Sequence, residues 1–128
     1  MAKIIIMAGS KSDQWFTDKL EKHAQEANFQ TETHFGSAHK KPLEVLKNVA
    51  LYDDDKVVFI TVAGRSNALS GVIAANTKKP VIACPPFKDK TDFMVNINST
   101  LQMPSGTPVL TVLDPKNAIN AAQRILDL

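Results

Sequence analysis

The sequence predicts an α/β protein: a three-layer sandwich with a central parallel sheet of about five strands. Short apolar runs typical of buried strands alternate with segments of helical periodicity along the whole chain. The strand-like runs are almost continuously hydrophobic, as strands covered on both faces are. The connections between the segments are short, and the length of 128 residues fits one domain spanning residues 1–128.

The first half of the chain begins with a strand at Lys3–Ala8. A helix follows, and Ser12 or Asp13 is a suitable capping residue for it. Phe29–Phe35 alternates apolar and polar side chains, which predicts a strand near an edge of the sheet. A second helix starts at Pro42, because proline is favoured in the first turn of a helix. Its predicted apolar face consists of Leu43, Leu46, Val49 and Ala50.

The second half repeats the alternation. Strands are predicted at Lys56–Ala63, Pro80–Ala83 and Pro108–Leu113. Helices are predicted from Asn67 to Ala75, near Met94–Leu101, and from Asn117 onward. Right-handed crossovers between these strands favour a flavodoxin-like or Rossmann-like topology, in which ligands bind beyond the carboxyl ends of the strands.

The composition limits the classes of function that the chain can have. A formal net charge of +2 with scattered lysines does not indicate a nucleic-acid or anionic-membrane partner. Cys84 is the only cysteine, so an internal disulfide is impossible and a cytoplasmic location fits. We expect Cys84 to lie in the core, and the three histidines lack the spacing of metal ligands, so no metal site is expected.

Two loops at predicted strand ends are suited to a phosphorylated ligand. Gly9–Asp13 offers the hydroxyls of Ser10 and Ser12, the carboxylate of Asp13 and free backbone N–H groups. The second loop places Ser37, His39 and Lys40 just before the helix at Pro42. Histidine is the side chain best suited to move a proton near neutral pH. The alternative reading is an ordinary pair of strand-to-helix turns with a solvated histidine.

A third loop follows the predicted central strand and contains Gly64, Arg65, Ser66 and Asn67. Its small residues allow a ligand to approach the backbone closely, although a tight turn would use the same residues. His23 and His34 are expected to be structural or to face solvent.

These motifs occur in the order found in the PurE family of purine biosynthesis, and the resemblance covers nearly the whole chain. The matching stretches are Gly9–Asp13, Ser37–Lys40, Ala63–Gly71, Ala83–Pro86 and Leu101–Gly106. The resemblance implies a three-layer α/β fold, usually an octamer, and an enzyme that carboxylates aminoimidazole ribonucleotide without ATP or biotin. The family's mutase form typically has a histidine in the third stretch; Ala63–Gly71 has none and is similar to the form that uses carbon dioxide directly.

The resemblance also implies roles for individual residues. His39 would be the general acid/base, and Asp13 would bind the ribose hydroxyls together with the substrate-binding Ser10 and Ser12. Ser37 and Lys40 would help to hold the phosphate. The carbon dioxide pocket would be formed by Gly64, Arg65, Ser66 and Asn67.

Two other functions stay open at this stage. The first is the mutase of the same family, which moves a carboxyl group from the exocyclic nitrogen to carbon four. The second is a non-catalytic nucleotide- or flavin-binding module. Trp15 and Tyr52 are the only Trp and Tyr, and neither is expected in a loop that would flank a flavin.

Overall fold

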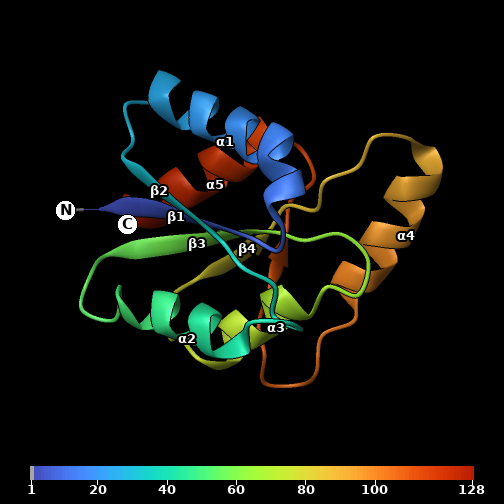
Figure 1. Ribbon diagram of the computed structural model, residues 1–128. Helices are drawn as coiled ribbons and strands as arrows, with labels where there is room; N and C mark the ends of the chain where they lie inside the picture. Colours follow the sequence, from blue (N-terminus) through green and yellow to red (C-terminus); the bar gives the residue numbers. More distant parts are fainter. Residues whose placement is uncertain (1) are drawn as a thin grey trace.

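A computed structural model describes residues 2–128 and has a five-stranded parallel sheet with helices on both faces (Figure 1). The strand order is β2-β1-β3-β4-β5. This strand order is the flavodoxin-like one and not the Rossmann one. It confirms the predicted fold class. The strands are β1 (Lys3–Ala8), β2 (Thr31–Phe35), β3 (Val57–Val62), β4 (Val81–Ala83) and β5 (Leu110–Thr111).

Each connection carries a helix, as right-handed crossovers between parallel strands require. The helices are α1 (Gln14–Glu26), α2 (Pro42–Ala50), α3 (Ala68–Ala75), α4 (Lys90–Leu101) and α5 (Pro115–Leu126), and a short 3₁₀ turn, η1 (Lys11–Asp13), precedes α1. In Figure 1, α1 and α5 cover one face of the sheet, and α2 and α3 cover the other. The fourth helix, α4, lies beyond the carboxyl ends of the strands.

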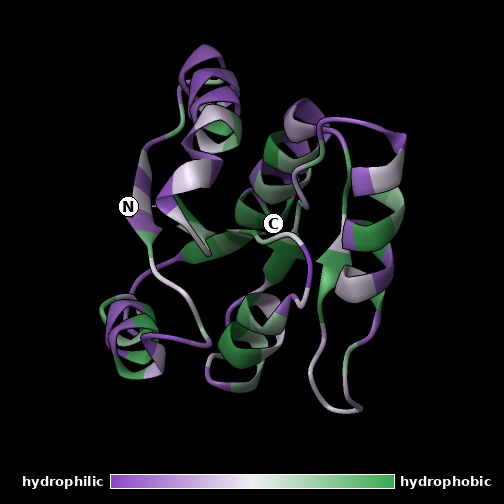
Figure 2. Ribbon diagram, turned by 45° about the vertical axis from the view of Figure 1, so that its right-hand side comes forward, coloured by the Kyte–Doolittle hydropathy of each residue, from purple (hydrophilic) through white to green (hydrophobic). Residues whose placement is uncertain are grey.

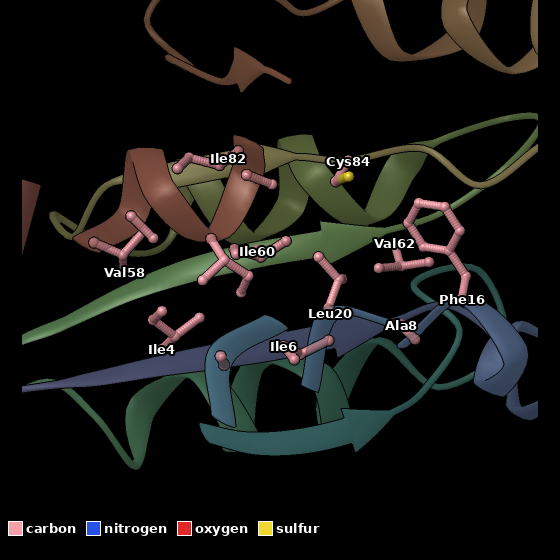
Figure 3. Close-up of a cluster of buried hydrophobic side chains, with 14 of the residues drawn as sticks. Ile4, Ile6, Ala8, Phe16, Leu20, Val58, Ile60, Val62, Ile82 and Cys84 are labelled. Atoms are coloured by element: carbon pink, nitrogen blue, oxygen red, sulfur yellow. The ribbon is translucent and has the colours of Figure 1, made fainter. Parts of the chain in front are cut away.

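The core consists of two apolar layers separated by the sheet, because side chains alternate between the faces of each strand. Ile4, Ile6 and Ala8 of β1 face α1 and α5, where Leu20 and Cys84 are also buried (Figure 3). On the opposite face the buried residues include Ile5, Met7, Val45, Phe59 and Ile73. Figure 2 shows the central strands as mainly hydrophobic ribbons and α1 as a mainly hydrophilic one.

Several predicted boundaries differ from the structure. The last helix begins at Pro115, because Asp114 caps it by accepting a hydrogen bond from the Asn117 N–H at 3.0 Å. The helix α4 begins at Lys90, four residues before the predicted start, because Asp89 accepts a hydrogen bond from the Asp92 N–H and caps it. The last strand is shorter than Pro108–Leu113 and pairs only at Leu110 and Thr111.

Two predicted details of the helices are wrong. Val45 and Val49 form the buried face of α2, whereas Leu43 is 81% exposed. Asp13 occupies the capping position of α1, but its side chain makes no capping hydrogen bond; Ser10 instead caps the preceding turn. Among residues 2–128 no helix has the length and apolarity needed to cross a membrane.

Candidate functional site

A cavity of about 430 Å³ lies at the carboxyl ends of β1, β2, β3 and β4, next to the place where the strand order reverses. Its volume is in the range that suits a small organic ligand. Eight of the ten predicted site residues line it: Ser10, Ser12, Asp13, Ser37, His39, Gly64, Arg65 and Ser66. The remaining two, Lys40 and Asn67, are not part of its lining.

The loop after β1 forms the first wall. Ser10 has an extended backbone, and its Oγ accepts a hydrogen bond from the Ser12 N–H at 3.2 Å. The Oγ atoms of the two serines are 2.8 Å apart. This turn brings two hydroxyls and the Asp13 carboxyl to the cavity within four residues of the strand end. Hydroxyls and backbone N–H groups at a helix start are typical ligands of a phosphate.

The loop after β2 is folded around the Ser37 hydroxyl. Ser37 Oγ accepts hydrogen bonds from the N–H groups of His39 and Lys40, both at 3.2 Å, and its carbonyl accepts one from the Lys41 N–H. The lone pairs of the hydroxyl are thus occupied, and its proton stays available to a ligand oxygen. Ser37 therefore both shapes the turn that presents His39 and offers one donor.

A hydrogen bond fixes the protonation pattern of the His39 ring. Its Nε2 lies 3.0 Å from the backbone carbonyl oxygen of Ser66. A carbonyl only accepts, so Nε2 carries the hydrogen and the neutral ring has its lone pair on Nδ1. Ser66 has a φ of 54°, an uncommon left-handed backbone for a residue with a side chain. Such backbone outliers concentrate at functional sites.

Asn67 supports the site from inside the protein. Its Oδ1 caps α3 by accepting from the Ser70 N–H at 3.1 Å, and its Nδ2 donates to Thr100 Oγ1 at 3.1 Å. The Asn67 N–H donates to Ser99 Oγ at 2.6 Å. All three contacts join the third loop to α3 or α4, so the structure gives this side chain a scaffolding position.

Asn67→Ala is expected to lower the free energy of unfolding by about 2–4 kcal/mol, since it removes a helix cap and leaves buried partners unpaired. Chemical denaturation monitored by circular dichroism measures the change. Asn98→Ala is the matched control, because Asn98 lies on the exposed side of α4 and its amide donates only to the Met94 carbonyl. Equal losses in the two variants would contradict this role.

The far wall of the cavity comes from residues that the sequence did not single out. Trp15 of α1, Pro86, Lys88, and Asp92 and Asn96 of α4 all line it. Trp15 stands on a helix, as expected, yet its ring reaches the cavity. Asp92 and Asn96 reach the cavity because α4 lies beyond the carboxyl ends of the strands (Figure 1).

Asn96 is held in one orientation. Its Nδ2 donates to the Pro86 carbonyl at 2.6 Å and to Asp92 Oδ1 at 3.3 Å. The side chain is buried, and its Oδ1 has no hydrogen-bond partner among residues 2–128. An unpaired buried acceptor costs about 1–3 kcal/mol. The amide lies against Gly64, where a Cβ would approach Oδ1 and Nδ2 to 3.4 Å.

Charged groups form one rim of the cavity. Burial, and then the nearby Asp92 carboxylate, raise the pKa of Asp13 above its usual value, while the Lys88 ammonium opposes them. Arg65 Nη2 lies 3.7 Å from Asp92 Oδ1. Arg65 is 73% exposed, so this ion pair contributes little to stability and leaves the guanidinium available.

The other reactive side chains lie elsewhere. His23 pairs with Glu26 on α1, at 3.9 Å. His34 contacts the Tyr52 hydroxyl, which itself donates to Glu32 at 2.8 Å; this confirms a structural role. Burial raises the pKa of the Cys84 thiol to about 12, which excludes a thiolate nucleophile near neutral pH and confirms its place in the core.

The fold and the cavity define an α/β protein with a histidine-bearing site at the strand ends. Comparison with known proteins identifies its kind. The family model described as AIR carboxylase matches residues 3–128. The chain therefore belongs to the AIR carboxylase (PurE) family, a group of carboxy-lyases of purine biosynthesis, as the sequence motifs predicted.

Individual relatives agree. Over 98% of its length the chain is 44% identical to a phosphoribosylaminoimidazole carboxylase of Archaeoglobus fulgidus and covers 69% of that protein. It is 37% identical to the human bifunctional phosphoribosylaminoimidazole carboxylase/succinocarboxamide synthetase, of which it spans 30%. The crystal structure of Treponema denticola PurE superposes with a TM-score of 0.91 at 37% identity, over 99% of this chain and 81% of that one.

Proposed function

We propose that this enzyme carboxylates aminoimidazole ribonucleotide at carbon four with carbon dioxide, giving carboxyaminoimidazole ribonucleotide. The observation that carries the proposal is the histidine content of the site. His39 is the only histidine lining the cavity in the described part of the chain, and Ala63–Gly71 supplies none. The relatives from A. fulgidus and T. denticola bear the name carboxylase, which supports the same form.

The ribonucleotide fits the two serine-bearing loops. Ser10, Ser12 and Ser37 offer hydroxyls to the phosphate, and the Asp13 carboxylate accepts hydrogen bonds from the ribose hydroxyls. Lys40 lies outside the cavity lining, whereas Lys88 belongs to it. We therefore assign a positive charge for the phosphate to Lys88, with Lys40 acting only at longer range.

The reaction needs few groups. The aminoimidazole is an enamine whose carbon four attacks carbon dioxide, so a carbon–carbon bond forms and the electron pair of one C=O bond moves to oxygen. Carbon four then loses its hydrogen as a proton to Nδ1 of His39, and its electrons restore the aromatic ring. Proton transfer of this kind contributes about 10²–10⁴-fold, and holding the two reactants together supplies a further part of the acceleration.

The third loop is the proposed place for carbon dioxide. Gly64 has no side chain to fill the space beside Asn96, and Arg65 and Ser66 line the same part of the cavity. Asn67, buried in its scaffolding contacts, acts there only by holding the loop.

Labelled bicarbonate distinguishes the carboxylase from the mutase. With carbonic anhydrase present to equilibrate carbon dioxide, label is expected to enter the product at the full rate of turnover. A mutase would convert the N-carboxylated ribonucleotide quickly and would exclude the label during that conversion. Fast conversion without label would therefore establish the mutase and refute our assignment.

We also propose that the chain works as a homo-oligomer, as its family usually does. Several large apolar side chains are exposed in the single chain, among them Leu43, Met94, Leu101 and Leu110. Two of them lie on α4, which packs on its own domain through few buried residues. A second copy would cover these side chains and hold α4 in place.

A further inference from the structure

We propose that Asn96 recognises the exocyclic amine of the substrate through its Oδ1 atom, and so determines which imidazole ribonucleotide is accepted. This inference rests on the proposed function. It starts from the one side-chain oxygen of the cavity wall that is buried and unpaired within residues 2–128. Such an atom is uncommon in a folded protein, and a hydrogen-bond donor on a ligand is a group that would satisfy it.

The orientation of the amide is determined by its partners. Both groups that contact Nδ2, the Pro86 carbonyl and the Asp92 carboxylate, accept hydrogen bonds and cannot donate them. The amide therefore cannot be turned over, and Oδ1 stays the free end. Oδ1 therefore needs a hydrogen-bond donor on the ligand.

Only one donor of the proposed substrates remains for it. Carbon dioxide and the ionised phosphate carry no N–H or O–H group. The ribose hydroxyls are assigned to Asp13. The exocyclic amine is left, and it is attached to the ring carbon next to carbon four, the carbon that reacts.

The position of Asn96 agrees with this choice. Its amide lies against Gly64, in the loop assigned to carbon dioxide, so the amine and the reacting carbon would lie side by side there. Oδ1 is closed to solvent, so contact with the ligand needs the side chains around Oδ1 to move aside.

The contact also favours the chemistry. An amine that donates a hydrogen bond gains electron density on nitrogen. The nitrogen lone pair is conjugated with the ring and makes carbon four nucleophilic. Asn96 would thus orient the ring and assist the attack on carbon dioxide.

The test compares aminoimidazole ribonucleotide with imidazole ribonucleotide, which lacks only the amine. Calorimetry should show that the wild-type enzyme binds the amine-bearing ligand about tenfold more tightly. In Asn96→Leu, which has nearly the same shape, the preference should fall below twofold. Binding of imidazole ribonucleotide should change less than threefold, because that ligand never used Oδ1.

Asn98→Leu is the matched control on the exposed side of the same helix and should keep the full preference. A purely structural role for Asn96 would weaken both ligands equally and leave their ratio unchanged, which would overturn the inference. If Asn96→Leu does not fold, the ratio of the two ligand affinities in the wild-type enzyme is the remaining test. A preference below twofold for the amine-bearing ligand would overturn the inference. If the wild-type enzyme carboxylates aminoimidazole ribonucleotide but shows no such preference, only the role of Asn96 is refuted. If the enzyme does not bind aminoimidazole ribonucleotide at all, the proposed function is refuted too.

Discussion

His39→Asn is expected to fold normally, to bind aminoimidazole ribonucleotide with little change and to lose turnover by about 10²–10⁴-fold. The asparagine amide reaches only as far as Nδ1 of the ring, so the 3.0 Å hydrogen bond from Nε2 to the Ser66 carbonyl is lost; this bond is exposed, and its loss costs little stability. What the variant lacks is a group that takes the proton from carbon four. Steady-state rates at saturating substrate and bicarbonate measure the loss.

His23→Asn is the matched control, because His23 lies on α1 and is not part of the cavity lining. It should retain the wild-type rate. If His39→Asn also kept a rate within a few-fold of wild type, another group would have to remove the proton, and the mechanism proposed here would be wrong.

Asp13→Asn is expected to weaken binding of the ribonucleotide by about 10–150-fold, which corresponds to about 1.5–3 kcal/mol for hydrogen bonds to a charged group. The same variant should be more stable than wild type at pH 7. Burial and Asp92 raise the pKa of Asp13, so the ionised carboxyl is less stable in the folded protein than in the unfolded chain.

The sign of this effect gives a second measurement. The penalty is complete above the raised pKa of the folded protein, shrinks as the pH falls below that pKa, and vanishes below about 3.9, the ordinary value for an unfolded chain. The stability gained by Asp13→Asn should therefore shrink as the pH falls through that window. Asp18→Asn, at an exposed position of α1, is the matched control. Unchanged ligand affinity in Asp13→Asn would place the ribose elsewhere.

The sequence predicted the sheet and the half of the site that follows β1, β2 and β3. Buried parallel strands leave a continuous apolar signal, and loops at their carboxyl ends must share one edge of the sheet. Local patterning also predicted α2, but not which side it buries. The sequence pattern places Leu43 on the apolar face of α2, but Leu43 is exposed in the structure. The position of α2 on the sheet turns Val45 and Val49 inward instead.

The other half of the site was not predictable in this way. Lys88, Asp92 and Asn96 enter the cavity because α4 returns over the strand ends, and only two residues of that helix are buried. Its periodicity is therefore weak. The same long-range packing decides that Asn67 points into the α3–α4 contact, whereas its neighbours Arg65 and Ser66 face the cavity.

The single tryptophan gives this enzyme a built-in optical reporter. Trp15 lines the cavity, with the Lys88 ammonium 5.3 Å from the centre of its ring. The single tyrosine, Tyr52, is buried in the opposite layer of the core. Light that excites the indole ring but not the phenol ring therefore gives fluorescence from Trp15, at the cavity, alone. A ribonucleotide that draws Lys88 toward its phosphate changes the surroundings of the indole, so occupancy can be followed by emission without attaching a dye.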